Sequence, residues 1–247
     1  MNNLFSKKLI LKKTHDFCAT KQPRLTVVFI HGLATDSSCF NNAIKYLEGT
    51  TSLKDVRFVT FDLLGSGKSY TNDKLNYDYK EQIEALHNAI SKLDLATPLV
   101  LVGHSMGTFI ATRYADTYKK SVKHLILISP PIYTDTELEN PAFKTAIEAF
   151  REAISVKNRK ILEEKSFNNS IKNIVLDKKN YKILANLKTY ATLIYGDMDR
   201  FIAAHNIPMV LKENPKYLRA IKTIGKHGVS HDKYNKMVEI LEEILND

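Results

Sequence analysis

The residues with the clearest chemical potential in this 247-residue chain lie in the pentapeptide GHSMG, residues 103–107. It follows the apolar run PLVLV and precedes the helix-like pattern MGTFIATRYADTY. A G-x-S-x-G turn between a strand and a helix is a nucleophile elbow, in which small residues flank a serine held above the sheet edge. The helix that begins there adds free N–H groups and a dipole that favour negative charge. The pattern predicts that Ser105 is a nucleophile.

A serine nucleophile needs a base and an acid that orients the base, and both follow later in the chain. Asp197 and Asp199 come directly after the apolar run ATLIYG, and GKHGVSHD with His227 and His231 follows the next strand-like run. Both groups lie at C-terminal ends of predicted strands, where open α/β sheets place ligand sites. The order Ser105, Asp199, His227 suits a triad in which the histidine relays the serine proton. Asp199 is favoured over Asp197 because the acid must reach across to the next strand's loop.

An oxyanion hole is the remaining part of such a site. The residues HGL close the run LTVVFI, and the backbone N–H of Leu33 can point at a developing oxyanion together with that of Met106. Losing one such donor typically adds about 3–4 kcal/mol to the barrier. His31 and His104 are expected to pack or to brace loops, because their turns direct both side chains away from Ser105.

The elements that must position these residues follow a regular order. Short β-branched runs alternate with longer amphipathic segments, which predicts an α/β fold with a mostly parallel central sheet flanked by helices. The central runs are nearly all apolar, as in strands covered on both faces. The predicted strands cover residues 7–13, 25–30, 57–62, 98–103, 124–129, 191–196 and 218–224. The predicted helices cover residues 39–48, 77–93, 106–118 and 232–245.

The segment 133–188 interrupts this alternation. It contains no strand candidate, only helical patterns such as PAFKTAIEAFREAI and RKILEEKSF, and it is too long for a plain loop. We expect a small helical cap inserted into a core domain formed by residues 1–132 and 189–247. Because the segment follows a strand whose C-terminal end faces the site, its helices should lie over the pocket mouth. Tyr133 and Phe143 could cover the serine there, and ordinary packing within the cap is the favoured interpretation of both.

Composition narrows the classes of partner. Apolar content of 44% and charged content of 26% are ordinary for a soluble globular protein. The net charge of +9 is spread along the chain without an arginine-rich run, so we expect no nucleic-acid partner. No run is apolar enough for a membrane span, and the N-terminal residues do not predict a secretory signal. Two cysteines, Cys18 and Cys39, favour a reducing compartment, and the cytoplasm is the default.

The segment DLLGSGKS, residues 62–69, superficially resembles a phosphate-binding loop. That loop needs a glycine five positions before the glycine of GK[ST], so that backbone N–H groups can surround the phosphates. Asp62 occupies this position, and its carboxylate would repel a phosphate. The segment is better interpreted as a strand-ending turn whose glycines adopt positive φ. A nucleotide-binding protein is therefore disfavoured.

Together these motifs resemble the α/β-hydrolase superfamily, in its capped, single-domain branch. The resemblance spans nearly the whole chain and rests on motifs at residues 31–33, 62–69, 103–107 and 196–199 and on the late histidine at 227. It implies an α/β-hydrolase fold in which D-x-x-G-x-G-x-S is a structural turn at the rim of the site. It also implies that the acid is the last residue of G-x-x-D, Asp199. A serine nucleophile disfavours dehalogenase and epoxide-hydrolase chemistry, which use a carboxylate in this fold.

We therefore expect a serine hydrolase that cleaves a carboxylic ester or thioester of a small to medium substrate through an acyl-enzyme, without metal or cofactor. C–C bond hydrolases share the Ser–Asp–His set and remain the nearest alternative. A non-catalytic ligand-binding protein of the same fold is a further alternative, against which the complete triad argues. The acyl group, the alcohol group and the oligomeric state do not follow from the sequence.

Overall fold

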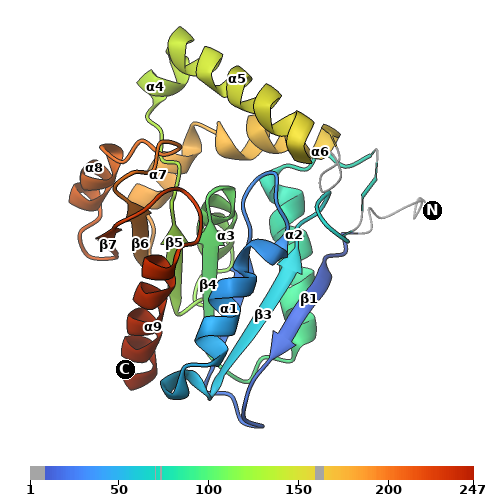
Figure 1. Cartoon of the computed structure of the whole chain (residues 1–247), viewed down its shortest axis with the longest axis vertical. Coiled ribbons are helices and arrows are strands. Elements are labelled where there is room, and N and C mark those ends of the chain that lie inside the picture. The colour runs from blue at the N-terminus through green and yellow to red at the C-terminus, as the bar shows by residue number, and fades with distance from the viewer. Residues whose placement is uncertain (1–8, 70, 73, 159–163) are drawn as a thin grey trace.

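A seven-stranded sheet forms the centre of the computed structural model, which describes residues 9–69, 71–72, 74–158 and 164–247 (Figure 1). Its strand order is β1-β3-β2-β4-β5-β6-β7. Only β1 is antiparallel to its neighbour, and the other five pairings are parallel. In chain order the strands are β1 (Lys12–Phe17), β2 (Leu25–Ile30), β3 (Val56–Asp62), β4 (Leu99–His104), β5 (His124–Ile128), β6 (Tyr190–Gly196) and β7 (Leu218–Thr223). The α/β fold predicted from the sequence is confirmed.

Helices cover both faces of the sheet and enclose two apolar cores (Figure 1). Along β2, Val27 and Phe29 enter one core and Val28 and Ile30 enter the other, because successive strand residues point to opposite faces. The first core is closed by α1 (Asn41–Glu48) and α9 (His231–Asn246). The second is closed by α2 (Tyr79–Ile90), α3 (Met106–Thr117), α7 (Lys179–Ala185) and α8 (Asn206–Glu213). None of the helices in the described part of the chain has the length and apolarity needed to cross a bilayer.

The predicted strand at 7–13 is wrong in its position. Residues 7 and 8 lie outside the described residues, and 9–11 are not part of a strand. Leu9 and Leu11 are buried against the core, which explains the apolar pattern. The ladder with β3 is formed by the following polar segment, Lys12–Phe17. An edge strand exposed to solvent needs no apolar face, so hydrophobic patterning missed it.

The other predicted elements agree with the structure within about two residues. The helix predicted at 77–93 ends in a short 3₁₀ turn, and its first turn is capped by Asp78, whose side chain accepts the Glu81 N–H at 3.0 Å. The helix predicted from residue 39 begins with a 3₁₀ turn before α1. The helix α8 was not predicted, since it is shorter than the window in which a helical period is visible.

The described residues between β5 and β6 form helices joined by turns, without a strand, as the sequence predicts. Helices α4, α5 and α6 lie beyond the sheet edge at which the parallel strands end (Figure 1). α7 instead packs against α3 and α8 in the core. The helices before α7 are α4 (Asp135–Glu139), α5 (Pro141–Asn158) and α6 (Glu164–Ser170), and a π turn follows at Ile171–Val175. The first part of the predicted helix RKILEEKSF, residues 159–163, lies outside the described residues.

The turn DLLGSGKS is filled by the carboxylate of Asp62. One carboxylate oxygen accepts the Ser37 N–H at 3.0 Å and the Ser37 hydroxyl at 2.6 Å, and the other accepts the Lys68 N–H at 2.8 Å. Gly65 and Gly67 have φ of 75° and 53°, and a Cβ on Gly67 would lie 2.3 Å from the carboxylate. The Asp62 carboxylate thus accepts the hydrogen bonds of this turn, in the place of the phosphate that a phosphate-binding loop would hold.

We predict that Asp62→Ala lowers the free energy of unfolding by about 2–4 kcal/mol, because it leaves the buried N–H and hydroxyl of Ser37 and the partly buried N–H of Lys68 without an acceptor. Urea unfolding followed by circular dichroism measures this, with Asp116→Ala on the exposed side of α3 as the control. A melting temperature of the wild type that rises with magnesium and ATP would contradict the structural role of the turn.

Candidate active site

The turn between β4 and α3 holds Ser105 in a strained backbone conformation, with φ 51° and ψ −120°. Its N–H donates to the Ile128 carbonyl at 2.9 Å, which fixes the turn to β5. A Cβ on Gly103 would lie 2.5 Å from the Gly107 carbonyl oxygen, and a Cβ on Gly107 would lie 2.1 Å from the Ile30 carbonyl oxygen. Both glycines are therefore required by close backbone approach. The half-buried Ser105 side chain stands at the N-terminus of α3.

The loop after β2 lies directly against this turn. A Cβ on Gly32 would be 3.1 Å from Cβ of Ser105, so the next residue, Leu33, is close to the serine. Met106 is the first residue of α3, and its N–H has no partner within the helix. Among the hydrogen bonds of the described residues, neither the Leu33 nor the Met106 N–H donates to a protein acceptor. Both N–H groups are available to an oxyanion.

His31 connects this loop to the end of β3. The Leu63 N–H donates to His31 Nε2 at 2.9 Å, so the ring proton resides on Nδ1, which donates to the Gly32 carbonyl at 2.8 Å. Burial lowers the pKa of His31 below its ordinary value, which keeps the ring neutral. The imidazole thus braces the loop that carries Leu33.

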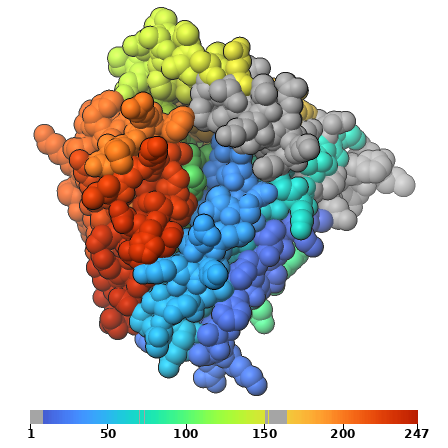
Figure 2. All heavy atoms as spheres, in the orientation of Figure 1, coloured from blue at the N-terminus to red at the C-terminus, as the bar shows by residue number. Residues whose placement is uncertain are grey.

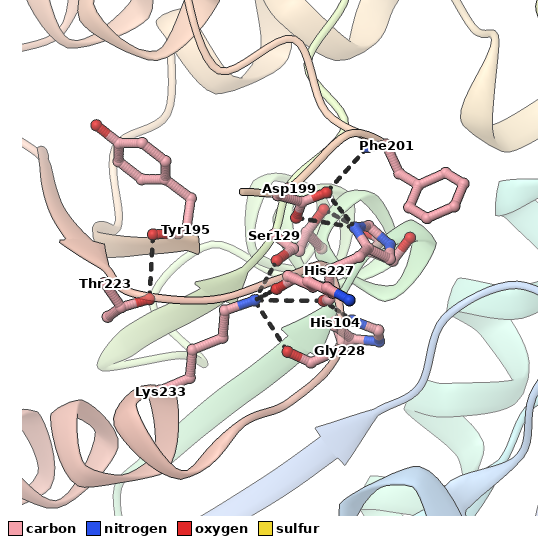
Figure 3. A network of polar contacts seen from close by, with 12 residues as sticks. His104, Ser129, Tyr195, Asp199, Phe201, Thr223, His227, Gly228 and Lys233 are labelled. Atoms are coloured by element: carbon pink, nitrogen blue, oxygen red, sulfur yellow. Dashed lines mark hydrogen bonds and ion pairs between the residues drawn. The ribbon is translucent and has the colours of Figure 1, made fainter. Parts of the chain in front are cut away.

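Asp199 and His227 are in direct contact (Figure 3). The two carboxylate oxygens lie 3.1 and 3.0 Å from Nδ1 of His227, and the Phe201 N–H donates to the carboxylate at 3.0 Å. Burial acts to raise the pKa of Asp199, but His227, the Phe201 N–H and the Ser129 hydroxyl together lower it below its ordinary value. An ionised carboxylate at Nδ1 directs the ring proton there and leaves Nε2 as a proton acceptor.

The other acid and histidine considered from the sequence lie elsewhere. The exposed Asp197 accepts the Gly225 N–H at 3.0 Å and so ties the β6 turn to the β7 turn. The exposed His231 begins α9 and packs against the rings of Tyr46 and Tyr234, with centroids 5.2 and 5.1 Å away. Neither side chain contacts His227 among the interactions of the described residues.

Ser105 and His227 are brought to the same edge of the sheet without a hydrogen bond between them in the described residues. The link is His104, which precedes the serine. Its Nε2–H donates to the His227 carbonyl at 2.9 Å, and the two rings have centroids 5.1 Å apart. Catalytic hydrogen bonds are often long before substrate binds and tighten in the Michaelis complex. His104 therefore does more than pack, because it ties the turn of Ser105 to the His227 loop.

The sequence patterns did not identify two residues of this region. Ser129 is buried at the end of β5, and Lys233 is buried in the first turn of α9 with its Nζ donating to Ser129 Oγ at 2.8 Å (Figure 3). The available signal was the helical period of α9, because Lys233 lies on the same stripe as the buried Met237, Leu241 and Ile244. A lysine on a core-facing stripe indicates a buried cation with a specific partner.

Comparisons with known proteins agree with this architecture. Residues 26–170, more than half of the chain, match the family described as the alpha/beta hydrolase fold. The protein therefore belongs to the α/β-hydrolase family. Among solved structures, an esterase from Exiguobacterium antarcticum has a TM-score of 0.71 at 18% identity, over 96% of both chains. A monoacylglycerol lipase from Paleococcus ferrophilus has a TM-score of 0.66 at 18% identity, covering 95% of this chain and 98% of the lipase.

Curated relatives are lipase-like in name. Lipase 1 of Psychrobacter immobilis is 25% identical over 258 residues, covering 90% of this chain and 74% of the lipase. The probable lysophospholipase BODYGUARD 5 of Arabidopsis thaliana is 33% identical over 123 residues, covering 49% of this chain. The matched chain spans 28%, 26% and 23% of the lengths of BODYGUARD 5, 2 and 1. The protein is thus an α/β hydrolase with lipase-like and esterase-like relatives.

The buried His104 predicts a loss of stability in acid. Burial, helped by the nearby charges of His227 and Lys233, lowers the pKa of His104 to about 3, against an ordinary value of about 6.5 in the unfolded chain. Between these values the unfolded state binds one proton more than the folded state. The free energy of unfolding should therefore fall as pH decreases, by about 1.4 kcal/mol per pH unit from this group.

We predict that His104→Gln, which keeps a donor for the His227 carbonyl, reduces this slope between pH 6 and 4 by about that amount. Urea unfolding of both proteins at pH 7, 6, 5 and 4 measures the difference. Comparing the two slopes removes the contribution of the other buried histidines, His31 and His124, whose pKa values are also lowered by burial. Parallel slopes would show that His104 is not neutral and buried as described.

Proposed function

We propose that this α/β hydrolase is a serine hydrolase that cleaves a carboxylic ester or thioester of a small to medium substrate through an acyl-enzyme. Ser105 is the nucleophile, His227 is the base and Asp199 is the orienting acid. The observation that carries the proposal is the contact of Asp199 with Nδ1 of His227 at 3.0 Å, on the sheet edge that also presents Ser105. The available N–H groups of Leu33 and Met106 support the same reaction as oxyanion donors.

In this reaction Ser105 Oγ attacks the carbonyl carbon of the substrate while Nε2 of His227 accepts the hydroxyl proton. The negative charge that develops on the carbonyl oxygen receives hydrogen bonds from the Leu33 and Met106 N–H groups and the field of the α3 dipole. Asp199 stabilises the imidazolium, which protonates the leaving alcohol or thiol as the C–O or C–S bond breaks. Water, deprotonated by His227, then attacks the acyl-enzyme, and the acid is released with Ser105 restored.

The names of several relatives are consistent with ester and thioester chemistry. Similar proteins include Lipase 1, an esterase and a thioesterase domain from a curacin biosynthetic pathway. These activities belong to those proteins, and they support the bond type here without defining the acyl or alcohol group. The free thiols of Cys18 and Cys39 fit the cytoplasm, which we propose as the compartment.

We further propose that residues 133–188 form a cap that limits substrate size, inserted into a core of residues 1–132 and 189–247. Tyr133 supports this, because its hydroxyl donates to the Phe201 carbonyl at 2.9 Å and its ring lies 4.7 Å from that of Phe143 in α5. The Phe201 ring in turn lies 5.3 Å from that of His227. Helix α5 is thereby connected to the proposed base by two ring contacts, with the Tyr133–Phe201 hydrogen bond between them.

A second contact joins the same segment to the oxyanion loop. Phe167 of α6 and Ile171 pack with Ala34 in a small apolar cluster, against which Leu33 and Ile147 of α5 also lie. Figure 2 shows the helices of this segment above the part of the surface where the chain coloured red meets the chain coloured blue. A segment covering the substrate should contact both the oxyanion loop, as Phe167 and Ile171 do, and the neighbours of the base, as Tyr133 does through Phe201.

The triad predicts selective losses of activity. Ser105→Ala should abolish both hydrolysis of p-nitrophenyl esters and labelling by a fluorophosphonate probe, with the melting temperature preserved because the hydroxyl supports no core contact. Asp199→Asn should reduce kcat by about 10⁴-fold, since the amide favours the wrong imidazole tautomer. Steady-state kinetics and labelling rates measure both effects.

Asp197→Asn is the matched control, because it changes the same group two residues away in the same turn. It should retain kcat within about twofold, as its carboxylate contacts the Gly225 N–H and not His227. Equal losses of kcat in Asp199→Asn and Asp197→Asn would contradict the assignment of Asp199 as the orienting acid. A fluorophosphonate-inert wild type that binds esters without turnover would instead indicate a ligand-binding protein.

The cap predicts a change in chain-length preference. Phe143→Ala removes the ring that packs on Tyr133, so kcat/KM for p-nitrophenyl esters of eight or more carbons should rise relative to the acetate ester. Phe17→Ala, an exposed phenylalanine on β1 remote from α5, is the control. An unchanged profile in Phe143→Ala, measured over esters of graded length, would contradict a cap at this position.

A further inference from the structure

The loop that carries His227 has no regular secondary structure of its own, and its carbonyl groups converge on one buried cation (Figure 3). Nζ of Lys233 donates to the carbonyl oxygens of Lys226 at 2.6 Å, Gly228 at 2.9 Å and His227 at 3.3 Å. Its fourth acceptor is Ser129 Oγ at 2.8 Å. Three consecutive peptide groups around the proposed base are thus held by a single ammonium.

Apart from these four hydrogen bonds, the location of Lys233 is unfavourable for a lysine. Its residue is 0% exposed, a state that lysine almost never adopts without a partner. It lies in the first turn of α9, where the helix dipole disfavours a cation. An apolar residue would continue the buried stripe of α9 without these costs. The four hydrogen bonds of Nζ offset these costs. Their acceptors lie in the loop that carries His227 and at Ser129.

Ser129 connects the ammonium to the acid of the triad. An ammonium only donates hydrogen bonds, so Ser129 Oγ must accept from Lys233 and its own hydrogen remains free for another acceptor. The Ser129 hydroxyl is one of the groups that lower the pKa of Asp199. Lys233 therefore acts on both sides of the Asp199–His227 pair, on the backbone of the histidine and, through Ser129, on the carboxylate.

His104 holds the same loop from the opposite side. Its Nε2–H donates to the His227 carbonyl, which is also the most distant of the three carbonyl acceptors of Lys233. His104 directly precedes Ser105, so this bond sets the distance between nucleophile turn and base loop. Lys233 adds contacts of its own to the loop, since its Nζ bonds the carbonyl groups of the residues on either side of His227.

We propose that Lys233 is a positioning residue for the base: its buried ammonium holds the His227 loop and, through Ser129, keeps His227 aligned with Asp199. This inference rests on the proposed function for its catalytic consequence. The geometry of the loop itself, however, can be tested independently of turnover.

The charge on Lys233 makes this alignment depend on pH. Burial lowers the pKa of Lys233 to about 8, while the carboxylate of Asp199 acts in the opposite direction. The titratable groups that face the ammonium are Asp199, His104 and His227, and only Asp199 is an anion. Loss of the proton leaves two donors for four acceptors and removes the positive charge beside Ser129. Activity should therefore fall as pH rises through about 8.

The experiment compares Lys233→Gln and Lys233→Arg with the wild type. Glutamine keeps two donors without a charge, whereas arginine keeps the charge throughout the accessible pH range. Lys236→Gln, whose lysine pairs with Glu239 one turn further along α9, is the control. We expect kcat to fall about 10²-fold in Lys233→Gln with little change in KM, because a misplaced base affects the chemical step and not substrate binding.

The pH profile separates positioning from mere folding. The decline of kcat/KM above about pH 8 in the wild type should move to higher pH in Lys233→Arg, and the control should follow the wild type. A residue needed only for stability would lower the melting temperature without moving this limb. Two results would overturn the proposal. One is a folded Lys233→Gln whose kcat/KM is within twofold of the wild type. The other is a decline of kcat/KM that occurs at the same pH in the wild type and in Lys233→Arg.

Proton NMR tests the same geometry without turnover, through the low-field resonance of the His227 Nδ1 proton bonded to Asp199. It should be sharp in the wild type below pH 8, broaden above that pH, persist in Lys233→Arg and be lost in Lys233→Gln. A resonance retained in Lys233→Gln overturns the proposal whatever the hydrolysis assays give. Absence of ester hydrolysis by the wild type, with the resonance behaving as expected, would instead reject only the proposed function.

Discussion

The close approach of the Gly107 backbone to the carbonyl of Ile30 is the constraint on which the site depends. A single methyl group at Gly107 would lie 2.1 Å from that oxygen, so α3 can begin beside the end of β2 only with glycine there. This approach places the Ser105 turn against the loop that follows β2, where a Cβ on Gly32 would lie 3.1 Å from Cβ of Ser105. The backbone strain at Ser105, of order 1–3 kcal/mol, is offset by the packed strands and helices on either side.

Buried polar groups help to hold the other half of the site, beside the contact of the Phe201 ring with His227 and the packing of Val229 against the core. The loop around His227 is fixed by the ammonium of Lys233, the imidazole of His104 and the carboxylate of Asp199, all of them buried. An unpaired polar group in a low-dielectric interior is costly, so such a network depends on the pairing of its members, and Nδ1 of His104 is left without a partner among the described residues. The same dependence makes the geometry of the base sensitive to the protonation state of its neighbours.

The helical segment between β5 and β6 combines two kinds of packing. α7 belongs to the core of the sheet domain, while α4 to α6 extend beyond the sheet and reach the site through Tyr133, Phe143 and Phe167. In its described first half, α5 meets the rest of the chain through aromatic and apolar contacts of Phe143 and Ile147. A cover of this kind suits a site that must admit substrate and then exclude water.

The sequence by itself determined the alternation of strands and helices, the elbow at Ser105 and the turn at Asp62, because each depends on local backbone chemistry or on hydrophobic period. The strand ladder at β1 was decided by pairing with β3, since an exposed edge strand carries no apolar signal. Which aspartate contacts His227 was decided by the paths of two turns that meet only in the folded chain. The role of Lys233 has the same origin, because its four acceptors come from β5 and the β7–α9 loop, and only the packing of α9 against the sheet brings them within reach of one ammonium.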